Sequence, residues 1–390
     1  MTTLHKLLRS HVDDGTVPGA VGLVAKDGRV EVAAVGAVDT EGTAPMARDS
    51  IFRIASISKP VVAAAVLMLV DDGLIALGDP VRRWLPELAQ PMVVRTPGAP
   101  VDVVVPAARP ITVADLLSSR AGYGFAADFS LPAVGLLFSE LKQGGPHPDA
   151  VAPPDAWTAA LGRIPLLRQP GEAWLYNTCS DIQGVLVARV TERPLGEFLA
   201  ERLFEPLGMT DTGFSVPPAA LDRFTSLYRD DLTLADAPDG KWSTPPAFES
   251  GAGGLVSTAD DWYAFARLLV GGGSVSGSAG GSGGGSAGGR RLLSAESVRL
   301  MTTDHLTPAQ RAEGALFLEG QGWGYGGSVD VAAVDPWNVP GRYGWVGGTG
   351  TTAHVVPSTG AVSVLLTQRA MADPTPPALM REFWRYAATA

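Results

Sequence analysis

The sequence predicts an α+β fold in which an antiparallel sheet flanked by helices is built from both ends of the chain, with a mainly helical domain inserted between them. Strand-like alternation occurs before residue 40 and again after residue 320, whereas the stretch between is mostly helical and irregular. Of the 390 residues 46% are hydrophobic, which suffices for a sizeable core in about two to three domains. We therefore expect a sheet domain of residues 1–80 and 241–390 and a helical domain of residues 81–240.

The first 75 residues predict a helix, a hairpin and a second helix in that order. The N-terminus reads as an amphipathic helix, and two strand-like runs follow at residues 20–25 and 29–35. Asp27 and Gly28 join these runs, and this pair is typical of the tight turn of a β-hairpin. Residues 56–73 are largely apolar and end at a glycine, which predicts a long buried helix.

The rest of the chain predicts short helices first and strands last. Helical spacing of apolar residues recurs in four segments: residues 113–119, 154–162, 180–192 and 195–203. Thr112 and Asp115 are placed like the two members of a capping box at the start of the first segment. Residues 91–110, rich in proline and valine, predict a loop or a small irregular hairpin. Strand patterns return in four late segments: residues 322–331, 343–346, 352–356 and 361–367.

Composition and charge exclude several classes of function. The net charge of -10 excludes a strongly basic nucleic-acid binder and argues against an anionic membrane surface as partner. Cys179 is the sole cysteine, so no intrachain disulfide or thiolate zinc site is expected, and we interpret it as a small buried residue. Residues 1–14 lack the uninterrupted apolar stretch of a signal peptide, and the longest apolar run, residues 60–70, is too short to span a bilayer. We expect a cytoplasmic protein without metal or cofactor.

Three formal motif matches carry little weight. Residues 271–289 contain only glycine, serine and alanine apart from Val275, and so predict a flexible surface loop. Two G-x-S-x-G matches, centred on Ser282 and Ser286, fall in this loop without the strand and helix that a nucleophile elbow needs. Residues 322–327 fit G-x-G-x-x-G, but no helix follows, so we predict glycines in a strand packed close to other backbone. The five histidines are scattered outside any recognisable triad pattern.

Ser56 and Lys59 form the pattern that carries chemistry. Positions i and i+3 share one face of a helix, so the hydroxyl and the ammonium can meet at the start of the predicted helix. The helix N-terminus adds partial positive charge, and a buried lysine with a lowered pKa can act as a base. The alternative is an N-capping Ser56 with a solvated Lys59. This lysine, one of only five, directly precedes an apolar run, which favours burial.

Five motifs in chain order strengthen the first interpretation. They are residues 51–59 (IFRIASISK), 111–117 (ITVADLL), 170–176 (PGEAWLY), 206–212 (PLGMTDT) and 253–258 (GGLVST). Together they resemble the class C β-lactamase-like serine hydrolases, which include penicillin-binding carboxypeptidases and the family VIII carboxylesterases. The resemblance runs from about residue 5 to 385 and implies the fold of β-lactamases and penicillin-binding proteins.

The resemblance also implies a Ser-Lys-Tyr site. Ser56 would be the acylated nucleophile, Lys59 its neighbour, and Tyr176 the tyrosine of the Tyr-x-Asn element. Whether Lys59 or Tyr176 is the base is a question of coupled titration that the residues leave open. The backbone N–H groups of Ser56 and Gly348 would form the oxyanion hole.

Two departures from the family pattern bear on the substrate. Thr178 stands at the asparagine position of Tyr-x-Asn, with Asn177 beside it. The Lys-Thr-Gly element reads Trp345-Val346-Gly347, which is similar to the family VIII esterases and related acyltransferases. Trp345 would wall the acyl or alcohol pocket, or be an ordinary core tryptophan, and Gly347 would permit close approach of the backbone. We expect Trp345, Gly347, Thr178 and Asn177 to contact the substrate.

These residues predict a serine carboxylesterase that hydrolyses short-chain esters of small molecules through an acyl-Ser56 intermediate. Enzymatic alternatives of the same fold are a β-lactamase, a D-alanyl carboxypeptidase and an acyltransferase. A different class is also open, namely a penicillin-binding-like protein without catalytic activity. The intact set of Ser56, Lys59 and Tyr176 weighs against that class.

Overall fold

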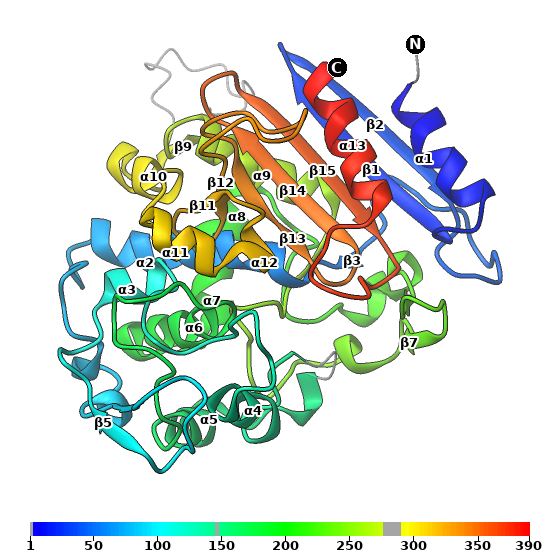
Figure 1. Ribbon diagram of the computed structural model, residues 1–390. Coiled ribbons are helices and arrows are strands. Elements are labelled where there is room, and N and C mark those ends of the chain that lie inside the picture. Colours follow the sequence, from blue (N-terminus) through cyan, green and yellow to red (C-terminus); the bar gives the residue numbers. More distant parts are fainter. Residues whose placement is uncertain (1–2, 145–147, 276–289) are drawn as a thin grey trace.

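The structure is a computed structural model, and it describes residues 3–144, 148–275 and 290–390. A seven-stranded antiparallel sheet forms the upper part of the molecule in Figure 1, and helices from the middle of the chain lie below it. The strand order is β11-β12-β13-β14-β15-β1-β2. The strands are β1 (Gly19–Lys26), β2 (Arg29–Gly36), β11 (Gly322–Trp323), β12 (Ser328–Val329), β13 (Tyr343–Gly347), β14 (Thr351–Val356) and β15 (Ala361–Thr367). Because β15 pairs with β1, the two ends of the chain meet in one sheet, and the predicted α+β class is confirmed.

The first hairpin follows the predicted turn chemistry. Lys26 pairs with Arg29, which leaves Asp27 and Gly28 as a two-residue turn. Their φ angles are 51° and 77°, the left-handed region that a type I′ turn requires. Asp-Gly therefore fixes the register of β1 against β2.

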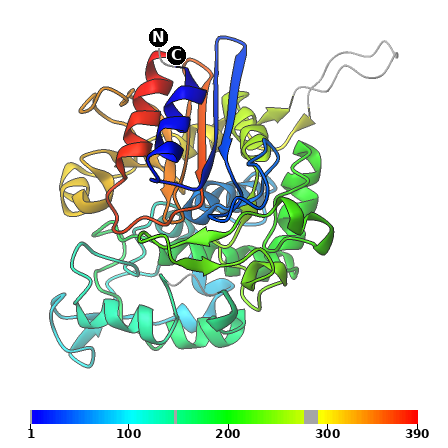
Figure 2. The same cartoon turned by 90° about the vertical axis from the view of Figure 1, so that its right-hand side faces the viewer.

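Two helices from opposite ends of the chain cover one face of the sheet. Helices α1 (Leu4–Asp13) and α13 (Ala378–Thr389) lie side by side (Figure 2). Leu8 and Phe383, both fully buried, share an apolar cluster with Val24 of β1. Val21 and Leu23, one position out of phase with Val24, belong to the larger cluster on the other face. Side chains of β1 thus alternate between two cores, as a strand buried on both faces requires.

The long buried helix begins later than the sequence predicts. Residues Ala55–Ser58 form a 3₁₀ turn, and helix α2 (Lys59–Asp71) continues from it. Pro60 stands in the first turn of α2, where its missing N–H costs nothing. Every residue from Lys59 to Leu69 is buried, because α2 packs between other elements and has no solvent face.

The middle of the chain is helical, as predicted. Its helices are α3 (Val113–Leu117), α4 (Pro132–Ser139), α5 (Pro154–Leu161), α6 (Thr178–Thr191), α7 (Leu195–Leu199) and α8 (Glu205–Leu207), with a π-helical turn at Ala200–Phe204. The capping box at α3 is present, with the Thr112 hydroxyl accepting from the Asp115 N–H. Helix α6 packs against α2 and thereby joins the helical part to the sheet part. The division into domains at residues 80 and 241 stays a prediction.

Short strand pairs and helices complete the fold. The pairs are β3 (Phe52–Arg53) with β8 (Val256–Ser257), β4 (Met92–Val94) with β5 (Val104–Pro106), β6 (Leu227–Tyr228) with β7 (Leu234–Asp236), and β9 (Ser274–Val275) with β10 (Arg290–Arg291). The remaining helices are α9 (Ala259–Val270), α10 (Ala295–Met301), α11 (Pro308–Glu313) and α12 (Ala315–Leu318). None of the helices in the described ranges has the length and apolarity needed to cross a bilayer.

Two glycine-rich segments have different outcomes. The stretch 322–331 is the hairpin of β11 and β12 and not one strand. A Cβ on Gly326 would lie 2.7 Å from the Lys59 carbonyl oxygen, so the prediction of glycines packed close to backbone is confirmed there. Of the predicted loop 271–289, the part from 276 to 289, with Ser282 and Ser286, lies outside the described residues; β9 and β10 pair at its base.

Candidate active site

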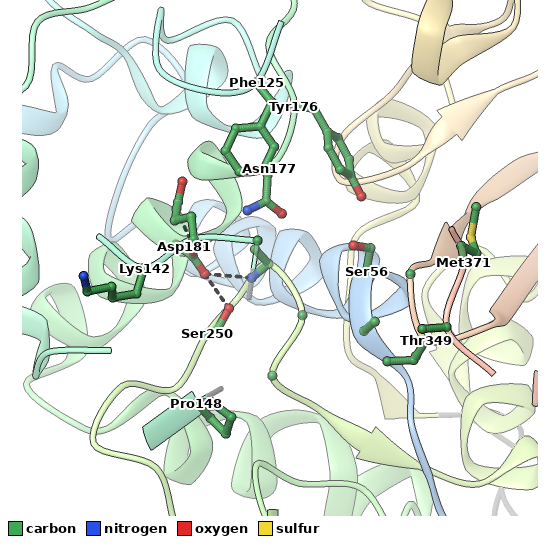
Figure 3. A pocket seen from close by; sticks show the side chains of 18 of the residues that line it. Ser56, Phe125, Lys142, Pro148, Tyr176, Asn177, Asp181, Ser250, Thr349 and Met371 are labelled. Carbon is green, nitrogen blue, oxygen red and sulfur yellow. Dashed lines mark hydrogen bonds between the residues drawn. The ribbon is translucent and has the colours of Figure 1, made fainter. Parts of the chain in front are cut away.

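A cavity of about 470 Å³ opens beside the 3₁₀ turn that precedes α2 (Figure 3). Its walls come from this turn, the loop before α6, the segment 250–254, the end of β13 and residues 370–374. The lining is mainly apolar and aromatic, with a few polar groups, a composition typical of small-molecule sites. Sequence segments far apart in the chain therefore converge on one site.

Ser56 lies in the cavity wall on a strained turn. Ala55, directly before it, has a φ of 46°, a left-handed conformation that is unfavourable for a residue with a Cβ. Such strain persists only where surrounding structure enforces it, and it concentrates at functional sites. The turn leaves Ser56 partly exposed to the cavity, whereas Ile57 and Ser58 are buried.

Lys59 is buried and lies directly against Ser56. Its Nζ is 2.8 Å from Ser56 Oγ and donates to the Ala252 carbonyl oxygen at 2.5 Å. The ammonium is also 4.7 Å from the centroid of the Tyr176 ring. Burial lowers the pKa of Lys59, while Tyr176 and the carboxylate of Asp181 act in the opposite direction. A lysine in these surroundings is suited to exchanging a proton with the serine hydroxyl.

Tyr176 is held between Lys59 and Trp345. The Trp345 indole N–H donates to the Tyr176 hydroxyl oxygen at 2.7 Å. Phe317 of α12 packs against the phenol, with ring centroids 4.8 Å apart. Backbone hydrogen bonds to Phe125 in both directions fix the main chain of Tyr176. Trp345 is thus both a wall of the cavity and a hydrogen-bond donor to the tyrosine.

A tight turn at Asn177 decides which neighbour of Tyr176 reaches the cavity. Asn177 has a φ of 81° and a ψ of -67°, and the Thr178 N–H donates to the Tyr176 carbonyl at 3.2 Å. These values define a classic γ-turn, a rare and strained conformation. Asn177 lines the cavity (Figure 3), whereas Thr178 is fully buried and its hydroxyl donates to Gln143. The expected contact between Thr178 and substrate therefore has no support in its position.

The end of β13 brings a second backbone N–H toward Ser56. Gly348 lines the cavity, and its N–H, like that of Ser56, donates to no other group in the described ranges. The hydroxyl of Thr351 donates to the Ile54 carbonyl at 2.8 Å and ties this strand end to the turn of Ser56. Gly347 does not line the cavity; a Cβ on it would lie 2.5 Å from the Ile54 oxygen, so glycine permits this close approach.

The cavity also contains residues that the motifs do not single out as site residues. Asp181 is buried and lines its floor, and Phe125, Phe317 and Met371 line its walls. Asp181 is an acidic residue in the predicted helix 180–192, and only the structure shows that the positions around it are buried. Phe317 and Met371 reach the cavity by tertiary packing alone.

The other nucleophile candidates lie elsewhere. Among the histidines that the structure describes, none lines the cavity. Cys179 is fully buried, as predicted, and burial raises the pKa of its thiol to about 12. A thiol with so high a pKa is a poor nucleophile at neutral pH.

Comparison with known proteins shows the family to which this chain is similar. Residues 4–382 match the β-lactamase family. An uncharacterized protein of Mycobacterium tuberculosis (strain CDC 1551 / Oshkosh) is 38% identical over 373 residues, which cover 93% of this chain and 88% of that protein. Esterase EstB of Burkholderia gladioli is 32% identical over 264 residues, covering 62% of this chain and 63% of the esterase.

One solved structure extends the likeness over nearly the whole chain. EstCE1, a hydrolase with promiscuous acyltransferase activity, superimposes with a TM-score of 0.77 and covers 98% of this chain and 97% of its own. The sequence identity is 24%, so this likeness concerns the fold alone.

Proposed function

This chain belongs to the β-lactamase family and is a serine hydrolase of that fold, and from this premise we propose that it is a carboxylesterase that hydrolyses short-chain esters. The observation that carries the proposal is the contact between Lys59 Nζ and Ser56 Oγ at 2.8 Å, at the wall of a mainly apolar cavity. The 32% identity to an esterase supports the choice of reaction. Assignment to the family VIII branch and a cytoplasmic location belong to the same proposal.

The proposed first half-reaction acylates Ser56. The Lys59–Tyr176 pair takes the hydroxyl proton while Ser56 Oγ attacks the ester carbonyl carbon. The carbonyl oxygen becomes negative and accepts hydrogen bonds from the backbone N–H groups of Ser56 and Gly348. Stabilisation of the oxyanion is usually the largest single contribution to the rate of such reactions. When the tetrahedral intermediate collapses, the carbon–oxygen bond to the alcohol breaks and the pair returns the proton to the leaving alkoxide.

The second half-reaction repeats these steps with water. The Lys59–Tyr176 pair accepts a proton from a water molecule that attacks the acyl carbon, and the same two N–H groups bind the oxyanion. Collapse releases the carboxylic acid and restores the proton to Ser56 Oγ. The choice between Lys59 and Tyr176 as the base stays open at this point.

Trp345 favours an ester over a β-lactam substrate. The family resemblance places a lysine here in β-lactamases, and a cation would bind the carboxylate that β-lactam antibiotics carry. Trp345 is neutral, and its N–H is already used by the Tyr176 hydroxyl, so it offers no donor to that carboxylate. The aromatic wall suits an apolar acyl or alcohol group.

An acyltransferase activity is the second candidate. A cavity of about 470 Å³ is of the size of drug-sized ligand sites, ~300–1,000 Å³, and exceeds what a short acyl chain needs. An alcohol could occupy the remaining space and replace water in the second half-reaction. Added alcohol acceptors would then divert product from the free acid to a new ester, which product analysis measures.

A fluorophosphonate probe tests the proposal directly. We expect one label per chain, on Ser56, detected by intact-mass spectrometry and peptide mapping. Ser56→Ala should abolish labelling and ester turnover. A label on Cys179, Ser282 or Ser286 would contradict the assignment of the nucleophile.

Substrate preference provides the second test. We expect a kcat/KM for p-nitrophenyl acetate and butyrate far above that for nitrocefin, a chromogenic cephalosporin, with Ser56→Ala giving the background rate. A kcat/KM for nitrocefin equal to or above the ester values would instead favour the β-lactamase alternative.

A further inference from the structure

Asp181 is a buried carboxylate whose burial ordinary packing does not explain. It lies on α6 at the floor of the cavity, and its side chain is almost completely removed from solvent. Among the residues that the structure describes, its three hydrogen-bond partners are neutral groups: the Ser250 hydroxyl, the Ala252 N–H and the Gln143 side-chain amide. Burying a carboxylate is costly unless it is well paired, so a residue with neutral partners only is an exception to ordinary packing.

The hydrogen bonds fit the ionised form of Asp181. Its Oδ1 accepts from the Ser250 hydroxyl at 2.7 Å and from the Ala252 N–H at 3.0 Å (Figure 3). Its Oδ2 accepts from Gln143 Nε2 at 2.8 Å, and the other end of that amide accepts from the Thr178 hydroxyl. A backbone N–H and an amide NH₂ can only donate, so both carboxylate oxygens face donors. The pKa of Asp181 is raised, because the effect of burial exceeds the lowering effects of these bonds and of Lys59.

A short chain of contacts connects Asp181 to the nucleophile. Asp181 fixes the N–H of Ala252, and the carbonyl of the same residue accepts from Lys59 Nζ at 2.5 Å. Lys59 in turn contacts Ser56 Oγ at 2.8 Å. Ala252 is flanked by Gly251 and by the Gly253-Gly254 pair, and glycine fixes its own backbone less than any other residue. This segment therefore depends on external bonds to hold the carbonyl that receives Lys59.

We propose that Asp181 is a positioning residue for the acyl-transfer reaction: its carboxylate anchors the Ala252 segment that holds Lys59 against Ser56, and its charge faces Lys59. The inference rests on the proposed function, because it gives Asp181 a role in the same reaction. Asp181 itself does not contact the reacting atoms; it acts through Lys59.

The charge of Asp181 has a consequence of definite sign. Lys59 is surrounded by Ser56 from the 3₁₀ turn, Tyr176 from the loop before α6, Asp181 from α6 and the Ala252 carbonyl. Tyr176 and Asp181 are its titratable neighbours in the described ranges, and both favour the ammonium form. Removing the Asp181 charge therefore lowers the pKa of Lys59 further. The limb of the pH–rate profile that reports Lys59 must move to lower pH.

Two substitutions separate charge from anchoring. Asp181→Asn keeps the shape and an acceptor oxygen for the Ala252 N–H, and the Gln143 amide can turn over to accept from the new NH₂. Asp181→Ala removes the anchor as well. We expect Asp181→Ala to lower kcat about 10²-fold, the effect of a displacement on the order of 1 Å at the reacting groups. We expect Asp181→Asn to lose less and to shift one limb of the profile down by about one pH unit.

Asp261→Asn is the matched control. Asp261 is likewise buried, its pKa is raised by burial, and it accepts from a hydroxyl (Thr212) and a backbone N–H (Asp211), each at 2.8 Å. It lies at the start of α9 and does not line the cavity. We expect this variant to lose stability without a change in the pH profile of ester turnover.

The outcomes are distinct. A shift of the acid limb supports the proposal and identifies neutral Lys59 as the base, and a shift of the alkaline limb supports it with Lys59 acting as the ammonium. Unshifted limbs, or a kcat loss in Asp181→Ala no larger than in Asp261→Asn, would overturn it. If Asp181→Asn does not fold, Ser250→Ala removes one anchor of the segment, and an unchanged kcat there would overturn it. A wild-type protein without labelling of Ser56 would refute the proposed function instead.

Discussion

Two regions of the molecule differ in how they are built. The layer between the sheet and helices α1 and α13 is apolar and regular, whereas the surroundings of Ser56 contain buried charges and strained backbone. In the first region Leu8, Val24 and Phe383 pack together from a helix, a strand and a second helix of regular geometry. The second region contains a buried ammonium, a buried carboxylate and two non-glycine residues with positive φ, Ala55 and Asn177. Each of these features costs free energy of folding.

The difference shows where this chain departs from maximum stability. A sequence that satisfied only packing would not bury Lys59 or strain Ala55. Natural proteins accept such costs where a reaction requires a fixed, partly desolvated arrangement, and regular regions offset them. Changes in the two regions should therefore have opposite signatures, one in activity and the other in stability.

The largest effects on activity should come from the pair beside Ser56. We expect Lys59→Ala and Tyr176→Phe each to lower kcat about 10²–10⁴-fold, the usual contribution of a positioned proton-transfer group. The double variant should lose little more than the worse single variant, because groups that act as a unit are not additive. Steady-state kinetics with p-nitrophenyl butyrate measures this, with Lys6→Ala, an exposed lysine on α1, as control. A double variant that lost the full product of both effects would refute a shared proton.

Phe383→Ala should affect stability and spare activity. Phe383 lies on the buried face of α13, and removing such a side chain costs about 3–5 kcal/mol of unfolding free energy. We expect kcat/KM below the new melting temperature to remain near the wild-type value. Denaturant unfolding and kinetics at one temperature check this, with Leu74→Ala, where the side chain is 54% exposed, as control. A large loss of kcat in the folded variant would mean that the two regions are coupled.

The regular region is also the one that sequence patterns describe well. The strand-like runs at residues 20–25 and 29–35 with Asp27-Gly28 between them are a local signal, and they predicted the hairpin of β1 and β2. Strand patterns at both ends of the chain predicted a sheet built from the two termini, and the pairing of β1 with β15 agrees with this. Helix α13 lies outside the predicted elements although Leu379 and Phe383 recur at helical spacing, so its signal was present in the sequence.

The sequence named several residues that the structure brings together at the candidate site, but it did not predict the backbone that holds them. Ser56 and Lys59 meet, but across a 3₁₀ turn, where positions i and i+3 also lie on the same side. Both Asn177 and Thr178 were expected to contact the substrate, but the γ-turn at Asn177 places Asn177 in the cavity wall and buries Thr178. Such a strained turn is imposed by tertiary contacts, such as the pairing of Tyr176 with Phe125, and no local propensity predicts it.

Trp345→Phe should produce an intermediate effect within the site. It keeps an aromatic wall and removes the N–H that donates to the Tyr176 hydroxyl. A hydrogen bond of this kind contributes about 0.5–1.5 kcal/mol, so we expect kcat to fall roughly tenfold at most, with KM little changed. The control is Trp337→Phe, a buried tryptophan that packs on Trp384 away from the cavity. A selective rise in KM would mean that Trp345 acts only as a wall.

Replacing residues 276–289 by Asn-Gly should have the smallest effect on activity. Val275 pairs with Arg290 in the short ladder of β9 and β10, so a two-residue type I′ turn can join them directly. A shorter connection loses less entropy on closure, at about 0.6 kcal/mol per halving of length, so the melting temperature should rise slightly. None of the four residues of β9 and β10 lines the cavity of Ser56, and kcat/KM for p-nitrophenyl butyrate should equal the wild-type value. A large loss of activity in a variant with an unchanged or higher melting temperature would show that this segment contributes to the site. Residues 276–289 would then belong to the functional region around Ser56 and not to the stable, regularly packed region.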